Sequence, residues 1–382
     1  MLSEKKFQIF LLIYVLLAPL SYHLLPYMGI YGSDLSMQFY FHHCPAMAEH
    51  SANLFQLAGA MCNDINNTHY AYPVLIYRLF SFSRFFETAQ SMYYFWSTLL
   101  VLTLLVSPWF WLRKRIGKFH FIYLGIGLLT ILQAPSFYAL ERGGTDIAFL
   151  LPWILATYFA LKDKWVPAGI LMAIAALLKL YPVMAIMPIV LGLFLIDDKK
   201  NFFKLSVAIG LTVIIAFSLD WHLWKIFILE VLPSETKLNI GTNAIGHSLI
   251  GPFSKFFAYP VMLTFWFLFA KIFALKTSEM RKLAFAGVLA MSTYFNGHSF
   301  DYNLITAFPF LYLAFELYFD GESPYKGNKM IMWGIIILCL TLLGPANWIF
   351  SFHKYAIKTK LLLELVGFAL IPTAILKFNK RL

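Results

Sequence analysis

The feature that most constrains this chain is a series of uninterrupted apolar runs, each roughly 15–22 residues long. Lipid offers no hydrogen bonds to the backbone, so a chain crosses a membrane only as helices or as a closed barrel. The runs are continuous and do not alternate, which is typical of helices. With 60% hydrophobic and 13% charged residues, the sequence predicts an all-α polytopic membrane protein.

The runs predict about 12 transmembrane helices in one domain, 1–382, with two long loops at about 27–88 and 220–255. The first run lacks a small-x-small cleavage site, so we expect an uncleaved helix there. The expected spans are Phe7–Leu25, Ala89–Leu112, Phe119–Tyr138, Ile147–Leu161, Trp165–Leu178, Val183–Ile196, Phe203–Leu219, Phe256–Leu275, Leu283–Phe295, Leu304–Phe319, Met330–Phe350 and Leu361–Leu376.

The basic residues predict the orientation, because loops on the cytoplasmic side carry an excess of Lys and Arg. With a cytoplasmic N-terminus, 20 of the 30 Lys and Arg residues fall inside. We therefore expect a multi-pass protein of the cell (inner) membrane with both termini in the cytoplasm. The net charge is +11. The basic residues lie between apolar runs, where they can contact anionic lipid, and they do not indicate nucleic-acid binding.

Two polar clusters bracket a predicted helical hairpin in the middle of the chain. The first helix of the hairpin is preceded by the cluster Glu141-Arg142-Gly143-Gly144-Thr145-Asp146. The turn is formed by Lys162-Asp163-Lys164, and the second helix is followed by the cluster Lys179-Leu180-Tyr181-Pro182. A hairpin returns to the side on which it began, so both clusters should face one compartment, the external one. Two acids, an arginine and a lysine at one surface can bind an anion or polarise a substrate.

Cysteines and histidines of the first loop are candidate disulfide partners or metal ligands. Cys44 and Cys62 share the first loop and either form a disulfide or stay as two thiols, whereas Cys339 lies in an apolar run. His42 and His43 match no compact zinc-ligand spacing, so we expect no metal. No glycine-rich phosphate loop occurs in the chain, and we expect no cofactor.

The two clusters, with Pro167-Ala168-Gly169 between them, resemble glycosyltransferase family 87 of the GT-C superfamily. The resemblance extends to Gly32-Ser33-Asp34-Leu35 after the first span and to Gly246-His247-Ser248-Leu249, where His247 departs from the family pattern and receives no role. It implies a GT-C-like membrane enzyme whose partners are a polyprenyl-phosphate sugar, typically mannose, and a lipid or glycan acceptor. The first loop has no Asp-x-Asp pair, which argues against metal-assisted chemistry.

The resemblance also implies roles for single residues. Asp34 would be the catalytic base that takes the acceptor hydroxyl proton in an inverting transfer. The donor phosphate would be bound by Arg142, Lys179 and His298, and the substrates by Glu141, Asp146, Tyr181 and Asp301. Each residue also has a plainer interpretation. Asp34 could be a solvated loop residue or a helix cap, and Glu141 and Asp146 could orient Arg142 or cap the next helix. Arg142 and Lys179 could be snorkelling side chains, Tyr181 an interfacial anchor, and His298 and Asp301 parts of an ordinary polar loop.

Two other classes of function compete with the enzyme. A transporter or lipid flippase tends to carry internal repeats and charges near the bilayer midplane. No repeat is visible here, and the ionisable residues gather at span ends on one side, which favours catalysis at an interface. A structural subunit would need no such cluster of external acids and bases.

Overall fold

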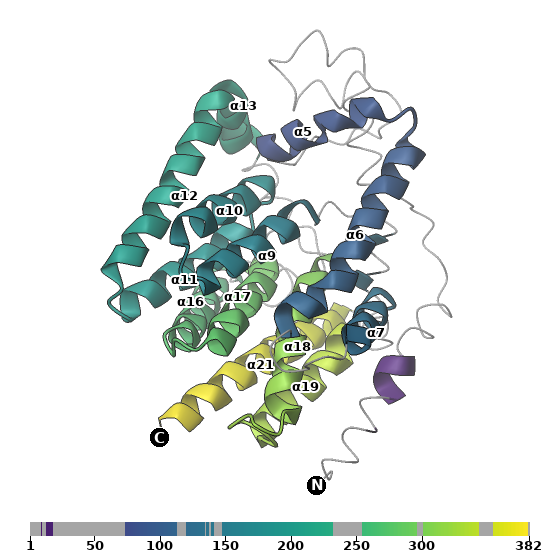
Figure 1. The fold of residues 1–382 in the computed structure, drawn as a ribbon, viewed down its shortest axis with the longest axis vertical. Coiled ribbons are helices and arrows are strands. Elements are labelled where there is room, and N and C mark those ends of the chain that lie inside the picture. Colours follow the sequence, from purple (N-terminus) through teal and green to yellow (C-terminus); the bar gives the residue numbers. More distant parts are fainter. Residues whose placement is uncertain are drawn as a thin grey trace.

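The structure is a computed structural model that describes residues 9, 13–17, 73–112, 120–133, 135–136, 139–140, 147–231, 254–295, 301–343 and 354–380. All regular secondary structure within these ranges is helical, which confirms the all-α part of the predicted fold class (Figure 1). Residues 13–17 are helical, and the further elements are α5 Val74–Phe80, η2 Ser81–Phe85, α6 Ala89–Leu112, α7 His120–Ile131, α9 Ile147–Leu161, α10 Trp165–Leu178, α11 Pro182–Leu195, α12 Lys199–Leu219, α13 Trp221–Ile226, η3 Phe227–Val231, α16 Ser254–Phe273, α17 Ser278–Ser292, η5 Thr293–Phe295, η6 Asp301–Ala307, α18 Phe308–Phe319, α19 Lys329–Leu342 and α21 Lys354–Asn379.

The central hairpin forms with the predicted bounds. Helices α9 and α10 pack against each other, and the turn between them closes through the amide of Lys164, which donates to the carbonyl of Phe159 at 2.9 Å. Asp163 adopts a left-handed conformation with φ 55°, which ends α9 in the way that glycine usually ends a helix. The polar tripeptide Lys162-Asp163-Lys164 therefore sets the position of the turn.

Within the described residues, three helices are long and apolar enough to cross a membrane: Ala89–Leu112, Lys199–Leu219 and Thr359–Asn379. The other apolar helices are shorter; α9, for example, has 15 residues and so a length of about 22 Å, less than the roughly 30 Å of a hydrocarbon core. The chain has the character of a membrane protein, and the expected number of spans stays a prediction.

Helix α17 occupies the middle of the bundle. Every residue from Leu283 to Ser292 is buried, and α17 packs against α9, α11, α16 and α18. Small side chains permit this crowding: a Cβ added at Gly287 would lie 2.2 Å from the ring of Phe269 on α16. A similar contact joins α10 to α12, because a Cβ at Gly169 would lie 2.8 Å from Cβ of Ala208.

Three of the turns that connect consecutive helices lie at one end of the bundle, which we name the hairpin end. They contain the left-handed residues Asp163, Asp197 and Lys276. Arg281, in the first turn of α17, donates to the carboxylate of Asp163 at 3.0 Å, and Lys282 donates to the carbonyl of Trp111 at the end of α6 at 2.9 Å. These turns, which belong to predicted cytoplasmic loops, thus lie at one end of the bundle. An ion pair joins α17 to the hairpin turn, and a hydrogen bond joins α17 to the end of α6.

The opposite end, which we name the Lys179 end, carries α5 and α13 (Figure 1). Arg78 on α5 forms an ion pair with Asp220, the residue between α12 and α13, with Nε 2.9 Å from Oδ2. The C-terminal end of α21 lies at the hairpin end (Figure 1). Because α10 runs away from the hairpin turn, Lys179 lies with α5 and α13.

Some predicted bounds differ from those observed. Helix α7 stops at Ile131, before the expected Tyr138, since Gln133 and Ser136 close turns on the carbonyls of Thr130 and Gln133. The start of the second predicted loop is helical over Trp221–Val231, where the indole of Trp224 donates to the carbonyl of Ala216 at 3.1 Å.

Candidate active site

The connector between α10 and α11 determines where Lys179 lies. Lys179 is the residue after α10, with an extended backbone at φ −150° and ψ 130°, and its amide still donates to the carbonyl of Ala175. Pro182 begins α11, a position where the missing amide hydrogen of proline costs nothing. A three-residue connector between two packed helices therefore positions the lysine.

Two aromatic rings hold the Lys179 side chain. Its Nζ lies 5.4 Å from the ring centroid of Tyr181 and 5.7 Å from that of Phe149, in the first turn of α9. The two rings meet edge to face at 4.9 Å, and both residues are almost fully buried. Such cation–π contacts stabilise a lysine by about 0.5–2 kcal/mol. We name Lys179, Tyr181 and Phe149 the lysine cradle.

The lysine cradle gives the Lys179 end a positioned ammonium group. Lysine acts on a phosphate as a point charge with three donors, and the partly buried site weakens screening by solvent. Tyr181 itself is 2% exposed, so its ring contacts Lys179 and Phe149 from within the protein.

Most of the other predicted site residues fall outside the described ranges: Asp34, Glu141, Arg142, Asp146 and His298. Their cluster nevertheless has described neighbours in sequence. Leu140 accepts a hydrogen bond from the Tyr93 hydroxyl at 2.8 Å, and Ile147 begins α9 beside the cradle. Asp301 is described only in its backbone, as the first residue of η6, which packs against α17 and α18.

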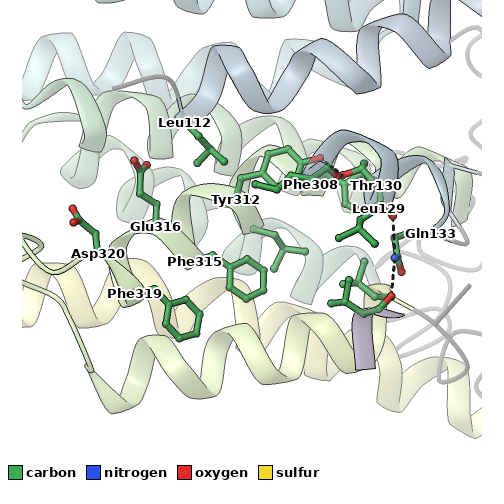
Figure 2. A pocket seen from close by; sticks show the side chains of 14 residues that line it. Leu112, Leu129, Thr130, Gln133, Phe308, Tyr312, Phe315, Glu316, Phe319 and Asp320 are labelled. Atoms are coloured by element: carbon green, nitrogen blue, oxygen red, sulfur yellow. Dashed lines mark hydrogen bonds between the residues drawn. The ribbon is translucent and has the colours of Figure 1, made fainter. Parts of the chain in front are cut away.

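A second feature, absent from the sequence-based expectations, is an apolar groove of ≈ 510 Å³ between α7, α18 and the 13–17 helix (Figure 2). Leu129, Leu311 and Phe315 are among its apolar lining residues. Gln133, Thr130 and Tyr312 lie toward one end, and Glu316 and Asp320 lie toward the other (Figure 2). The sequence indicates this groove only through a set of polar residues that lie inside apolar runs.

The polar residues of the groove form a hydrogen-bonded group. The hydroxyls of Thr130 and Tyr312 share a hydrogen bond, and the amide nitrogen of Gln133 donates to the carbonyls of Leu129 at 3.0 Å and Val15 at 3.4 Å. Tyr14 also joins the 13–17 helix to α19 through the carbonyl of Leu343. These contacts fix the polar end of the groove.

A buried charged pair on α21 was also missed. Lys360 and Glu364 have side chains 4% and 0% exposed, with Nζ 3.9 Å from Oε1. One turn further along, Phe368 packs against Tyr294 near the end of α17 and against Phe310. The pair therefore lies toward the Lys179 end of α21.

Comparison with known proteins decides the family. The model of glycosyltransferase family 87 matches residues 70–300, more than half of the 382-residue chain. The chain belongs to glycosyltransferase family 87. No curated protein matches it.

Membership makes the chain a membrane glycosyltransferase and selects the enzyme over the transporter and the structural subunit. The matched region contains both polar clusters of the hairpin and the whole lysine cradle. It ends before η6, α18, α19 and α21, so the groove is built partly outside it.

Proposed function

We propose that this glycosyltransferase transfers a sugar, with mannose the first candidate, from a polyprenyl-phosphate donor to a lipid or glycan acceptor. The observation that supports a phosphate donor is the lysine cradle. An ammonium group held over two rings, at a helix end in a membrane protein, suits an anionic headgroup at the bilayer surface.

The reaction is a single displacement at the anomeric carbon. The acceptor hydroxyl oxygen forms the new bond to that carbon, while the bond from the carbon to the phosphate oxygen breaks and its electron pair leaves with the lipid phosphate. The hydroxyl proton passes to a carboxylate, for which Asp34 is our candidate. One displacement inverts the configuration at the anomeric carbon.

The remaining residues receive binding roles. Lys179, Arg142 and His298 bind the departing phosphate, whose charge grows as the bond breaks. Glu141, Asp146 and Asp301 bind sugar or acceptor hydroxyls. Tyr181 serves the substrates through Lys179, since its buried ring lies beneath the ammonium group.

The site faces outward in this proposal. The hairpin end gathers Lys162, Lys164, Arg281 and Lys282, the type of residue that cytoplasmic loops retain. The Lys179 end then meets the external side of the cell membrane, and both termini lie in the cytoplasm.

A label-transfer assay tests the function. The full chain is reconstituted in vesicles with polyprenyl-phosphate [¹⁴C]mannose and a lipid extract of cells that lack the gene. We expect labelled product that requires the chain. Polyprenyl-phosphate glucose and a nucleotide sugar serve as comparison donors. Transfer from the nucleotide sugar alone would contradict the proposed donor, and movement of the labelled lipid across the bilayer without product would contradict transfer.

A further inference from the structure

The groove between α7 and α18 has two ends of different chemistry. Tyr123, near the start of α7, donates to the carbonyl of Leu112 at the end of α6, so α7 runs from the hairpin end toward the Lys179 end. Gln133 therefore lies toward the Lys179 end, and Asp320, which follows the last turn of α18, lies toward the hairpin end. The groove follows α18 for about 17 Å, close to one leaflet of a hydrocarbon core.

Gln133 leaves one hydrogen-bonding atom unused. The residue is 2% exposed, and its side chain donates two hydrogen bonds, both through Nε2. Its Oε1 is buried and accepts no hydrogen bond from the described part of the chain. A buried carbonyl oxygen without a donor is costly, and Gln133 lines the groove (Figure 2). A ligand in the groove that donates a hydrogen bond to this oxygen would remove that cost.

The charges of the lining select the kind of ligand. Glu316 and Asp320 contribute carboxylates, and the described lining residues include no lysine or arginine. Both carboxylates lie at the end of the groove away from Gln133, so an anionic headgroup beside Gln133 would meet no cation of the described lining, whereas the lysine cradle offers one. A neutral headgroup with hydroxyl donors, attached to an apolar chain, satisfies both Oε1 of Gln133 and the apolar wall.

We propose that this groove binds the chain of a neutral, hydroxyl-bearing lipid that accepts the sugar, with Oε1 of Gln133 accepting a hydrogen bond from its headgroup. This inference rests on the proposed function, and it assigns the acceptor to the lipids. Donor and acceptor then approach the Lys179 end from separate sites, the donor through a cationic cradle and the acceptor through a groove whose described lining contains no lysine or arginine.

Photo-crosslinking tests the groove without requiring sugar transfer. The full chain, in phosphatidylcholine vesicles, is irradiated with a diacylglycerol that carries a diazirine in one acyl chain, and adducts are located by mass spectrometry. We expect adducts on the peptide of α18. Excess unlabelled diacylglycerol should remove them, whereas polyprenyl monophosphate should not.

Matched variants on one helix provide the control. Leu129→Trp fills the groove, whereas Leu128→Trp places the same bulk on a side chain that is 50% exposed and outside the lining. Leu129→Trp should lower the α18 adducts about fivefold or more, and Leu128→Trp should leave them unchanged. Gel filtration checks folding, and Leu129→Phe replaces Leu129→Trp if the larger residue is not tolerated.

Two results would overturn the inference. Competition by polyprenyl monophosphate as strong as that by diacylglycerol would make the groove a donor site. Equal labelling of the two tryptophan variants would mean that bulk lipid is captured at the surface. The proposed function has a readout of its own, label transfer from the polyprenyl-phosphate donor, so the groove can fail as an acceptor site while that transfer is still observed.

Discussion

The lysine cradle and the Gln133 end of the groove lie toward the same end of the bundle, but they differ in charge. In the cradle, a cation is held over Phe149 and Tyr181. In the groove, neutral polar groups and two carboxylates accompany an apolar wall. If our proposals hold, the enzyme distinguishes two lipids with similar apolar tails by headgroup charge, which decides the site that each lipid enters.

The proton acceptor that we propose, Asp34, belongs to neither region, and its replacement should have the largest effect. Asp34→Asn removes the proposed base but keeps the size of the side chain, and turnover should fall about 10²–10⁴-fold. The KM values for donor and acceptor should change little, because the carboxylate acts in the transition state. Steady-state kinetics of label transfer measure this. Near-normal turnover would move the base to Asp146 or Asp301.

Removing a ring should loosen the cradle without removing its charge. Phe149→Leu should raise the donor KM about 2–30-fold through the lost cation–π contact, and thermal unfolding should show a destabilised protein. Phe265→Leu is the control, since Phe265 on α16 is also buried but its ring stacks on Phe269 and makes no recorded cation–π contact with Lys179 in the described part of the chain. An equal rise in donor KM for both variants would assign the effect to general destabilisation.

The groove should respond in the acceptor and not in the donor. Gln133→Leu should lower transfer into the organic-extractable lipid product about 2–10-fold at limiting acceptor, the size of one neutral hydrogen bond, with the donor KM unchanged. Gln90→Leu, on the exposed surface of α6, is the control. A change confined to the donor KM would reverse the assignment of the two sites.

Thiol labelling tests the outward orientation of the lysine cradle. In a chain without Cys44 and Cys62, Thr145→Cys and Ser299→Cys should react with an impermeant thiol reagent outside intact cells. Lys164→Cys, at the exposed hairpin turn, should react only after the membrane is opened, and buried Cys339 should stay silent. Labelling of Thr145→Cys and Lys164→Cys from the same side would contradict the outward-facing site.

The sequence predicts the hairpin accurately because its apolar runs end sharply at charged residues. Ile147–Leu161 and Trp165–Leu178 are bounded by Lys162-Asp163-Lys164 and Lys179, and the observed helices have the same bounds. Helix α17 begins five residues earlier than expected, at Ser278. Arg281 and Lys282 are accommodated there by Asp163 and by the end of α6, partners that are distant in sequence.

The two regions of the site were predictable to different degrees. Lys179 stands at a helix end beside a recognisable motif, so pattern alone found it, although its contact with Phe149 depends on the packing of α9 and α10. The groove joins residues from the 13–17 helix, α7 and α18, and no local pattern brings Gln133 near Tyr312. Asp34 and the Glu141–Asp146 cluster lie outside the described residues, so their roles stay predictions.

The most direct test of the central claim compares two lysines with similar contacts at opposite ends of the bundle. Lys179 lies over Phe149 and Tyr181, and Lys271, in the last turn of α16, lies 4.2 Å from the ring of Phe267. The measurement is the donor KM for polyprenyl-phosphate mannose in vesicles. Lys179→Gln should raise it about 10–100-fold, the loss of a charged hydrogen bond, and Lys271→Gln should leave it within about twofold. Equal donor KM values for Lys179→Gln and the unmodified chain would show that Lys179 does not bind the donor phosphate.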